Sequence, residues 1–255
     1  MEDENQSYIT GDNPMNEVIR QLYDRKSVRV FTDQEIREDI VQEILMAAAM
    51  APTAGNQQLY TILRITDPDS LRRLADSCDH QPFIAEGKLV LVFCADCLKW
   101  YEAFRLAGCS PRRPGEGDLL LAVDDALIAA QNAVTAAQSY GIGSCYIGDI
   151  MENIEEQRDI LGLPDYVFPA ALLVFGYPTQ QQKERPKPRR ADLSYIVHEN
   201  RYRQMGEEEL REMLGKEDHK DDYDLWIQAF CMRKYNSDFA REMTRSVKEY
   251  LKQFS

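Results

Sequence analysis

Apolar positions along the chain form two patterns, a helical spacing and continuous runs that are typical of buried strands. The spacing of Ile36, Ile40 and Ile44 predicts an amphipathic helix over residues 35–50, which ends before Pro52. Continuous runs of apolar, often β-branched residues instead predict strands that are covered on both faces. Two such buried strands are expected, at residues 88–95 and 168–176, and two further strands at residues 60–65 and 144–147.

Helical spacing also appears between and beyond these strands. Further helices are predicted at residues 14–23, 70–78, 118–140, 154–163 and 225–254. The helix at 118–140 carries mostly Ala and Leu on its apolar face, a surface that lets another helix approach closely. Residues 100–117 contain Pro111 and Pro114 and are predicted to be an irregular, mobile excursion, and residues 180–188 an extended connector. This layout predicts an α+β fold in which helices wrap a central sheet.

The net charge and the lengths of the apolar runs argue against several classes of partner. The formal net charge of −13 argues against binding to nucleic acid or to anionic membranes, because phosphate groups attract the opposite charge. The acidic N-terminus lacks the layout of a signal peptide, and no continuous apolar run is long enough to cross a bilayer. We therefore expect a cytoplasmic protein with neither a membrane nor a nucleic-acid partner.

The cysteines and histidines show no pattern of a metal or nucleophile site. Cys94 and Cys97 form a C-x-x-C pair, but no second pair lies at zinc spacing, so reduced thiols are favoured over a metal or redox site. The three histidines, His80, His198 and His219, have no partner pattern for a catalytic triad or a metal. We therefore expect no bound metal and no side-chain nucleophile.

A dense basic segment lies between the first two predicted helices. It places Arg25, Lys26 and Arg29 around the hydroxyl of Ser27. Residues 32–35 follow with a capping-box pattern that is expected to open the next helix. Packed cations beside a hydroxyl can hold a phosphate through charge-assisted hydrogen bonds, and a solvated surface cluster is the alternative interpretation.

A second basic island, Lys187-Pro188-Arg189, lies far downstream. Its proline restricts the spread of the two cations, so the two islands can clamp one phosphate from two directions. The alternative is a basic surface patch.

Two further stretches suit contact with a flat ligand. The glycines at residues 141–149 permit close backbone approach, although a helix end followed by a turn is equally expected there. The loop at residues 52–58 offers side-chain amides that both donate and accept hydrogen bonds, as the edge of a heterocycle requires. A solvated loop remains compatible with the same residues.

Taken in their order along the chain, these motifs resemble those of the FMN-dependent nitroreductase family. The matching motifs are R-x-S-x-R-x-F at residues 25–31, A-P-T-x-x-N-x-Q at 51–58, G-I-G-x-x-x-I-G at 141–148, F-G-Y-P at 175–178 and the basic pair at 187–189. The basic pair at 187–189 followed by residues 197–202 is most similar to the NADPH-preferring, flavin-reductase-like branch. The resemblance covers residues 15–202, which leaves an N-terminal tail at 1–14 and a C-terminal helical extension at 203–255.

The resemblance implies an antiparallel-dominated central sheet and an intertwined homodimer with one FMN at each subunit interface. The two basic islands would bind the FMN phosphate and ribityl chain, and Gln81 would meet the ribityl chain or the ring edge. The backbone at 147–149 would lie near the ring, and the loop at 53–58 would reach the flavin. The implied cofactor-binding residues are Arg25, Lys26, Ser27, Arg29, Thr53, Ala54, Gly55, Asn56, Gln58, Gln81, Ile147, Gly148, Asp149, Lys187 and Arg189.

The implied activity is NAD(P)H-dependent reduction of nitroaromatics, quinones or flavins by ping-pong hydride transfer through FMN. NADPH or NADH would be the co-substrate, and Arg105, Arg112 and Arg113 in the predicted excursion would bind it unless they are ordinary surface arginines. One alternative is a specialised flavoenzyme of the same fold, such as a reductive dehalogenase or a flavin-cleaving enzyme. Others are a non-catalytic flavin-binding protein and a protein whose acidic C-terminal helices bind a partner.

Overall fold

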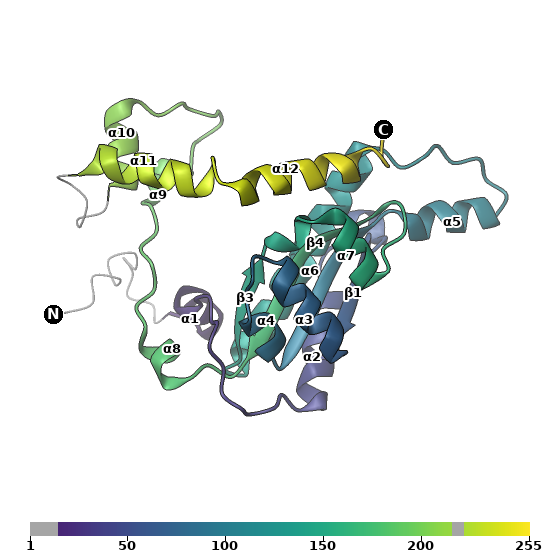
Figure 1. Cartoon of the computed structure of the whole chain (residues 1–255), viewed down its shortest axis with the longest axis horizontal. Helices are drawn as coiled ribbons and strands as arrows, with labels where there is room; N and C mark the ends of the chain where they lie inside the picture. The colour runs from purple at the N-terminus through teal and green to yellow at the C-terminus, as the bar shows by residue number, and fades with distance from the viewer. Residues whose placement is uncertain (1–14, 216–221) are drawn as a thin grey trace.

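The computed structural model describes residues 15–215 and 222–255, so the predicted tail and His219 lie outside the described residues. Its centre is one antiparallel sheet with the strand order β1-β2-β4-β3 (Figure 1). The strands are β1 (Tyr60–Ile65), β2 (Leu89–Asp96), β3 (Gly143–Ile147) and β4 (Val167–Gly176). Each coincides with a predicted strand to within one residue at either end, so the four strand predictions are confirmed.

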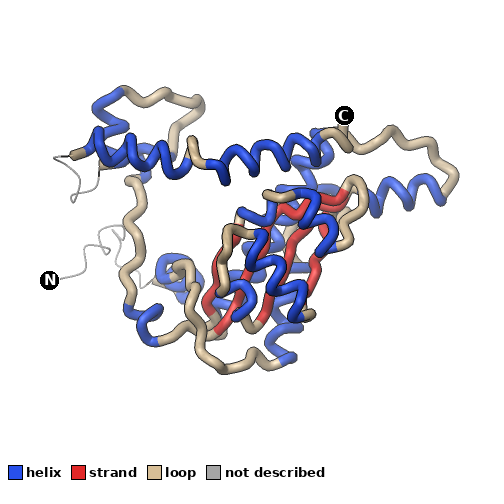
Figure 2. Tube along the Cα trace, viewed as in Figure 1, coloured by secondary structure: helices blue, strands red, loops and turns tan. Residues whose placement is uncertain are grey.

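Helices cover both faces of this sheet, as Figure 2 shows. One face packs against α2 (Glu38–Ala49) and α6 (Glu116–Ser139), and the other against α3 (Pro68–Ser77), α4 (Phe83–Glu86) and the end of α7 (Ile154–Leu161). Every residue of β2 and β4 is buried, which is why both strands are continuous apolar runs. The predicted α+β class with an antiparallel central sheet is confirmed.

The long helix α6 packs against both the sheet and α2. Its inward face is rich in alanine, and Ala122, Ala126 and Ala133 are fully buried, which allows the close approach that the sequence predicted. Among the described helices, α6 alone is long and apolar enough to cross a membrane by composition. Its buried alanines instead identify it as a helix of the domain core.

The predicted C-terminal extension, residues 203–255, contains α10 (Glu207–Leu214), α11 (Tyr223–Lys234) and α12 (Asp238–Leu251). The apolar stripe predicted at 225–254 is divided between α11 and α12, because the helix is interrupted between Lys234 and Asp238. Ser237 starts α12 by accepting a hydrogen bond from the Ala240 amide at 3.3 Å. A serine N-cap of this kind favours a new helix start over continuation.

Aromatic side chains dock α12 on its own domain. Tyr250 is fully buried and meets Phe168 of β4 edge-on, with ring centroids 5.0 Å apart. Phe254 is also buried and meets the Tyr166 ring at 5.5 Å. Burial of each ring contributes roughly 1.5–3 kcal/mol, so the end of the extension is part of the folded domain.

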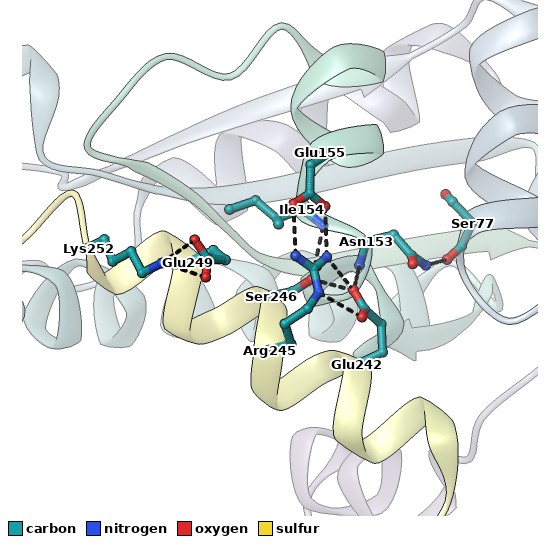
Figure 3. A network of polar contacts seen from close by, with 9 residues as sticks. All are labelled: Ser77, Asn153, Ile154, Glu155, Glu242, Arg245, Ser246, Glu249 and Lys252. Carbon is teal, nitrogen blue, oxygen red and sulfur yellow. Dashed lines mark hydrogen bonds and ion pairs between the residues drawn. The ribbon is translucent and has the colours of Figure 1, made fainter.

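A polar network joins the middle of α12 to the start of α7 (Figure 3). Arg245 donates to both carboxylate oxygens of Glu155, at 2.7 and 2.8 Å, and also to Glu242. Glu242 accepts from the amide of Asn153 at 3.1 Å, and the Ser246 hydroxyl accepts from the next amide at 3.0 Å. Side chains of α12 therefore satisfy amides at the N-terminus of α7 that would otherwise lack partners.

Three local predictions are wrong. Part of the predicted irregular excursion is the helix α5 (Leu98–Leu106), which projects from the body of the domain (Figure 1). The helix α8 (Gln180–Glu184) replaces the start of the predicted extended connector. The capping box does not form, because α2 begins at Glu38 with Arg37 at its N-cap and no side-chain cap. Two further short α-helices are α1 (Glu17–Asp24) and α9 (Leu193–Ile196).

Candidate functional site

The predicted basic segment runs along the outer edge of β3. The amide of Val28 donates to the carbonyl of Ser144 at 2.9 Å, and Ser27 forms an isolated bridge with the same residue. Gly143 makes this approach possible, because a Cβ there would lie 2.6 Å from a Val28 methyl group. The backbone of the basic segment is thereby fixed on the sheet.

Side chains of the two basic islands donate to backbone carbonyls on the opposite segment. Lys26 donates to the carbonyl of Arg185, and the Arg185 guanidinium donates to the carbonyl of Ser27 at 2.7 Å. Lys187 Nζ donates to the carbonyl of Tyr23 at 2.5 Å. The structure therefore brings together two segments that are far apart in the sequence. Arg185 was missed by the sequence analysis, and its only signal is a position two residues before Lys187.

Arg25, at the start of the basic segment, has an incomplete set of partners. Its Nε and Nη2 atoms are buried and have no acceptor among the described residues. Its guanidinium lies over the Tyr146 ring, 5.7 Å from the centroid. Burial, together with the charges of Arg190 and Arg25, lowers the pKa of Lys187. Arg25 and Lys187 therefore place positive charges close together, and an anionic group such as a phosphate would supply the acceptors that Arg25 lacks.

The other two predicted cations are more exposed. Arg29 is exposed, and its guanidinium lies 5.9 Å from the centre of the Phe83 ring. Arg189 is 69% exposed, and its Nη2 atom lies 4.0 Å from a carboxylate oxygen of Asp192. Neither contact joins these side chains to Arg25, so their place at a phosphate stays a prediction.

The predicted glycine turn surrounds β3. Gly141 has a φ of 70° and closes the end of α6, where left-handed glycines are common. Ile147 ends the strand and is buried. Among the described residues, a Cβ at Gly148 would meet only the Met151 side chain, at 4.0 Å, so no described residue fills the space beside this backbone. The turn therefore leaves room for a flat group along the chain.

Gln81 lies against the short helix η3 (Asp149–Met151) that follows this turn. Its side-chain amide donates to Oδ2 of Asp149 at 2.6 Å and to the carbonyl of Cys78 at 2.8 Å. Two predicted site residues thus meet in one place. Because both donors of the Gln81 amide are used, the amide presents its oxygen, an acceptor, to any ligand.

The loop at residues 53–58 is built on a buried carboxylate that the sequence analysis missed. Asp125 of α6 is only 3% exposed. It accepts from the amides of Ala54 and Leu59, both at 3.1 Å, and from the Thr53 hydroxyl. Two backbone amides and one hydroxyl of the loop therefore depend on a single side chain from a core helix.

The rest of this loop is also held in a defined conformation. Gly55 and Asn56 both have a φ of 57°, in the left-handed region. The Gln58 side chain donates to the last carbonyl of α2 at 3.2 Å. Trp100 of α5 donates from its indole to the Gln57 carbonyl at 2.8 Å. The loop is therefore tied to α2, α5 and α6, and it exposes Asn56.

The three predicted substrate-binding arginines lie on or after α5. Arg105 pairs with Glu102 of its own helix at 2.9 Å. Arg112 donates to Asp118 at 2.9 Å and lowers the pKa of that carboxyl. Arg113 is exposed. None of these contacts joins them to the two basic islands, so a role in substrate binding stays a prediction.

The C-x-x-C pair lies in the core. Cys94 is fully buried, Cys97 is 6% exposed, and neither is in a disulfide. Burial raises the pKa of each thiol to about 12, which makes both poor nucleophiles and poor metal ligands. Within residues 15–215 and 222–255, no group of three His, Cys, Asp or Glu side chains is placed to hold a metal ion.

A family model and several relatives match most of the chain. The model of the Nitroreductase family matches residues 22–177. The oxygen-insensitive NADPH nitroreductase of Salmonella typhimurium is 34% identical over 197 residues, which cover 77% of this chain and 79% of the relative. The FMN reductase [NAD(P)H] of Bacillus subtilis is 29% identical over 92% of this chain and 91% of its own length.

Solved structures agree in fold. The structure of Bacillus megaterium NfrA2 superposes with a TM-score of 0.78 at 28% identity, and covers 92% of this chain and 98% of its own. The structure of a Bacteroides fragilis protein gives a TM-score of 0.80 at 24% identity over 91% of this chain and 96% of its own. The chain belongs to the nitroreductase family, and the family predicted from the ordered motifs is confirmed.

Proposed function

We propose that this chain is an FMN-dependent NAD(P)H oxidoreductase that reduces small-molecule acceptors such as nitroaromatics, quinones or free flavin. Membership of the nitroreductase family, and the FMN reductases and NADPH nitroreductase among its relatives, support this function. The single structural observation that carries it is that the buried Nε and Nη2 atoms of Arg25 lack acceptors among the described residues. The phosphate of FMN provides these acceptors.

In this proposal the predicted cofactor-binding residues hold FMN, with Arg185 added to them. Arg25 and Lys187 anchor the phosphate, supported by the burial and then the neighbouring positive charges of Arg190 and Arg25 that lower the pKa of Lys187. Gln81 offers its amide oxygen to a hydroxyl of the ribityl chain or to a donor at the ring edge, supported by the engagement of both its N–H groups. The open backbone at Gly148 lies along the ring.

When bound, FMN supplies the hydride chemistry between NAD(P)H and the acceptor. The chain binds and orients the reacting groups, and no side-chain nucleophile is needed. NAD(P)H and the acceptor use the same open space in turn, which gives ping-pong kinetics. Arg105, Arg112 and Arg113 are the proposed contacts for the additional phosphate of NADPH.

The proposed enzyme is a cytoplasmic homodimer with one cofactor site at each subunit interface. Apolar side chains are exposed on neighbouring helices, including Leu22 of α1, Met46 of α2, and Leu121 and Ile128 of α6. Both α1 and α2 pack against α6, so a second copy can cover these side chains together. The net charge of −13 supports a small-molecule acceptor over a nucleic acid.

Paired titrations of the purified protein with FMN and with riboflavin test the phosphate anchor. Replacing Arg25 by alanine removes charged hydrogen bonds worth about 1.5–3 kcal/mol, so FMN affinity should fall by about 10- to 150-fold. Riboflavin affinity should change little, because riboflavin has no phosphate. Arg72→Ala, at a position 69% exposed on α3, is the matched control. Equal FMN affinity in the Arg25→Ala variant and the wild type would refute the anchor.

Steady-state oxidation of NADPH and NADH tests the activity. Turnover that depends on FMN and on an added nitroaromatic, quinone or flavin is the expected result. An FMN-loaded protein that oxidises neither nucleotide would instead be a non-catalytic flavin-binding protein.

A further inference from the structure

Glu152, directly after η3, is a buried acid without a role in the proposed function. It is 4% exposed, and its Oε1 atom has no hydrogen-bond partner among the described residues. Its amide donates to the Asp149 carbonyl at 3.0 Å and closes the tight turn of η3. Side chains three residues apart in such a turn lie on the same side. The carboxyl groups of Asp149 and Glu152 accordingly are in hydrogen-bond contact.

Acidic groups face Glu152 from three elements. They are Asp149 on its own turn, Asp79 after α3, and Glu242 on α12, and the buried Cys78 thiol lies on the same side. Burial first, and then these charges, raise the pKa of Glu152 to about 8. A contact between two carboxyl groups requires a proton between them, and Glu152 keeps that proton at neutral pH.

The surroundings hold Glu152 in this position. The next residue, Asn153, donates from its side chain to the Ser77 carbonyl at 2.8 Å and from its amide to Glu242 at 3.1 Å (Figure 3). The hydrogen bond from Arg245 is the main reason that the pKa of Glu242 falls to about 2. Glu242 therefore stays ionised, and the negative charge that it directs towards Glu152 persists at all ordinary pH values.

A chain of contacts leads from Glu152 to the candidate cofactor site. Protonated Glu152 donates to Asp149, and Asp149 accepts from the Gln81 amide at 2.6 Å. That bond orients the Gln81 amide so that its oxygen is presented to a ligand. Without the proton, two carboxylates would be in contact in a buried place, and their repulsion would displace Asp149 from Gln81.

We propose that Glu152 is a positioning residue of the flavin site, whose proton keeps Asp149 and Gln81 in the arrangement that binds FMN. This inference rests on the proposed function, because it places Gln81 and Asp149 beside the cofactor. Its consequence is that FMN binding weakens when Glu152 loses its proton at alkaline pH.

Fluorescence titration of the apo-protein with FMN between pH 7 and pH 9 tests this inference. The wild type should bind FMN about tenfold more weakly at pH 9 than at pH 7, a difference of about 1.4 kcal/mol. Glu152→Gln keeps a neutral donor at every pH, so its affinity should be constant over the same range. The matched control is Glu156→Gln, which removes an exposed carboxylate four residues away and should keep the pH dependence of the wild type.

Each other outcome gives a definite answer. A wild-type affinity that is constant from pH 7 to pH 9 overturns the inference without reference to any variant. Equal pH dependence of FMN affinity in the wild type and in Glu152→Gln also overturns the inference. This holds even if Glu152→Gln lowers the melting temperature of the apo-protein, because a lower stability with an unaltered pH profile indicates a structural role alone. A wild type that binds no FMN at pH 7 overturns the proposed function as well, so the two failures are distinguishable.

Discussion

Replacement of Asp125 by alanine is the sharpest test of how the loop at 53–58 is held. This carboxylate is 3% exposed and accepts hydrogen bonds from the amides of Ala54 and Leu59 and from the Thr53 hydroxyl. The alanine variant leaves the buried amide of Leu59 and the half-buried amide of Ala54 without an acceptor. The Thr53 hydroxyl can still donate elsewhere by rotation, so the two amides dominate the cost.

The expected magnitude follows from these two amides. A buried donor without a partner costs about 1–3 kcal/mol, so Asp125→Ala should lower the free energy of unfolding by about 2–6 kcal/mol. Asp125→Asn keeps one oxygen acceptor and should lose about half of that. The loop should also open locally, and FMN affinity should fall, because the loop is predicted to reach the flavin.

Urea unfolding and amide hydrogen exchange measure these effects. Asp124→Ala is the matched control, since Asp124 precedes Asp125 on the same helix but is exposed. Its free energy of unfolding should remain within about 0.5 kcal/mol of the wild type. If Asp125→Ala is as stable as Asp124→Ala, or if exchange at residues 54–59 is unchanged, the carboxylate does not hold the loop.

Two further substitutions test the docking of α12 and of the basic segment. Arg245→Ala should lower the melting temperature by breaking the contacts with α7. Arg241→Ala should not, because Arg241 pairs only within its own exposed turn among the described residues. Equal effects of the two substitutions would contradict the docking role. The Arg245 contribution should disappear as the pH falls well below 4, because its carboxylate partners have lowered pKa values and must be ionised. Gly143→Ala should cost about 1–3 kcal/mol in urea unfolding and weaken FMN binding, since the new Cβ would lie 2.6 Å from Val28. Gly117→Ala, where a Cβ meets nothing within 4 Å, should do neither, and a neutral Gly143→Ala would refute the close approach.

The centre of the sheet could be predicted from the sequence because β2 and β4 are buried on both faces. Continuous apolar runs such as residues 168–176 have few other interpretations once glycine and proline bound them. The helix α5 could not be predicted from the sequence, because Pro111 and Pro114 follow it closely and indicated an irregular segment over the whole of residues 100–117. Its aromatic residues, such as Trp100, find partners only in the folded chain, on the loop at 53–58.

The candidate site was predictable in part. The basic segment and the second island are visible as charge in an acidic chain, and hydrogen bonds from side chains to backbone carbonyls join the two regions in the structure. Asp125 was not predictable, because a lone aspartate in a helix is usually solvated and only tertiary packing buries it. Glu152 was missed for the same reason, since its altered pKa depends on acids from three separate elements.

The most direct test of the central claim is the anaerobic absorbance spectrum of the FMN-reconstituted protein during titration with NADPH and then NADH. The account predicts a yellow protein whose flavin absorbance is bleached by at least one nucleotide and restored by a nitroaromatic or a quinone. A protein that cannot be loaded with FMN, or a loaded protein whose flavin absorbance neither nucleotide changes, would contradict it.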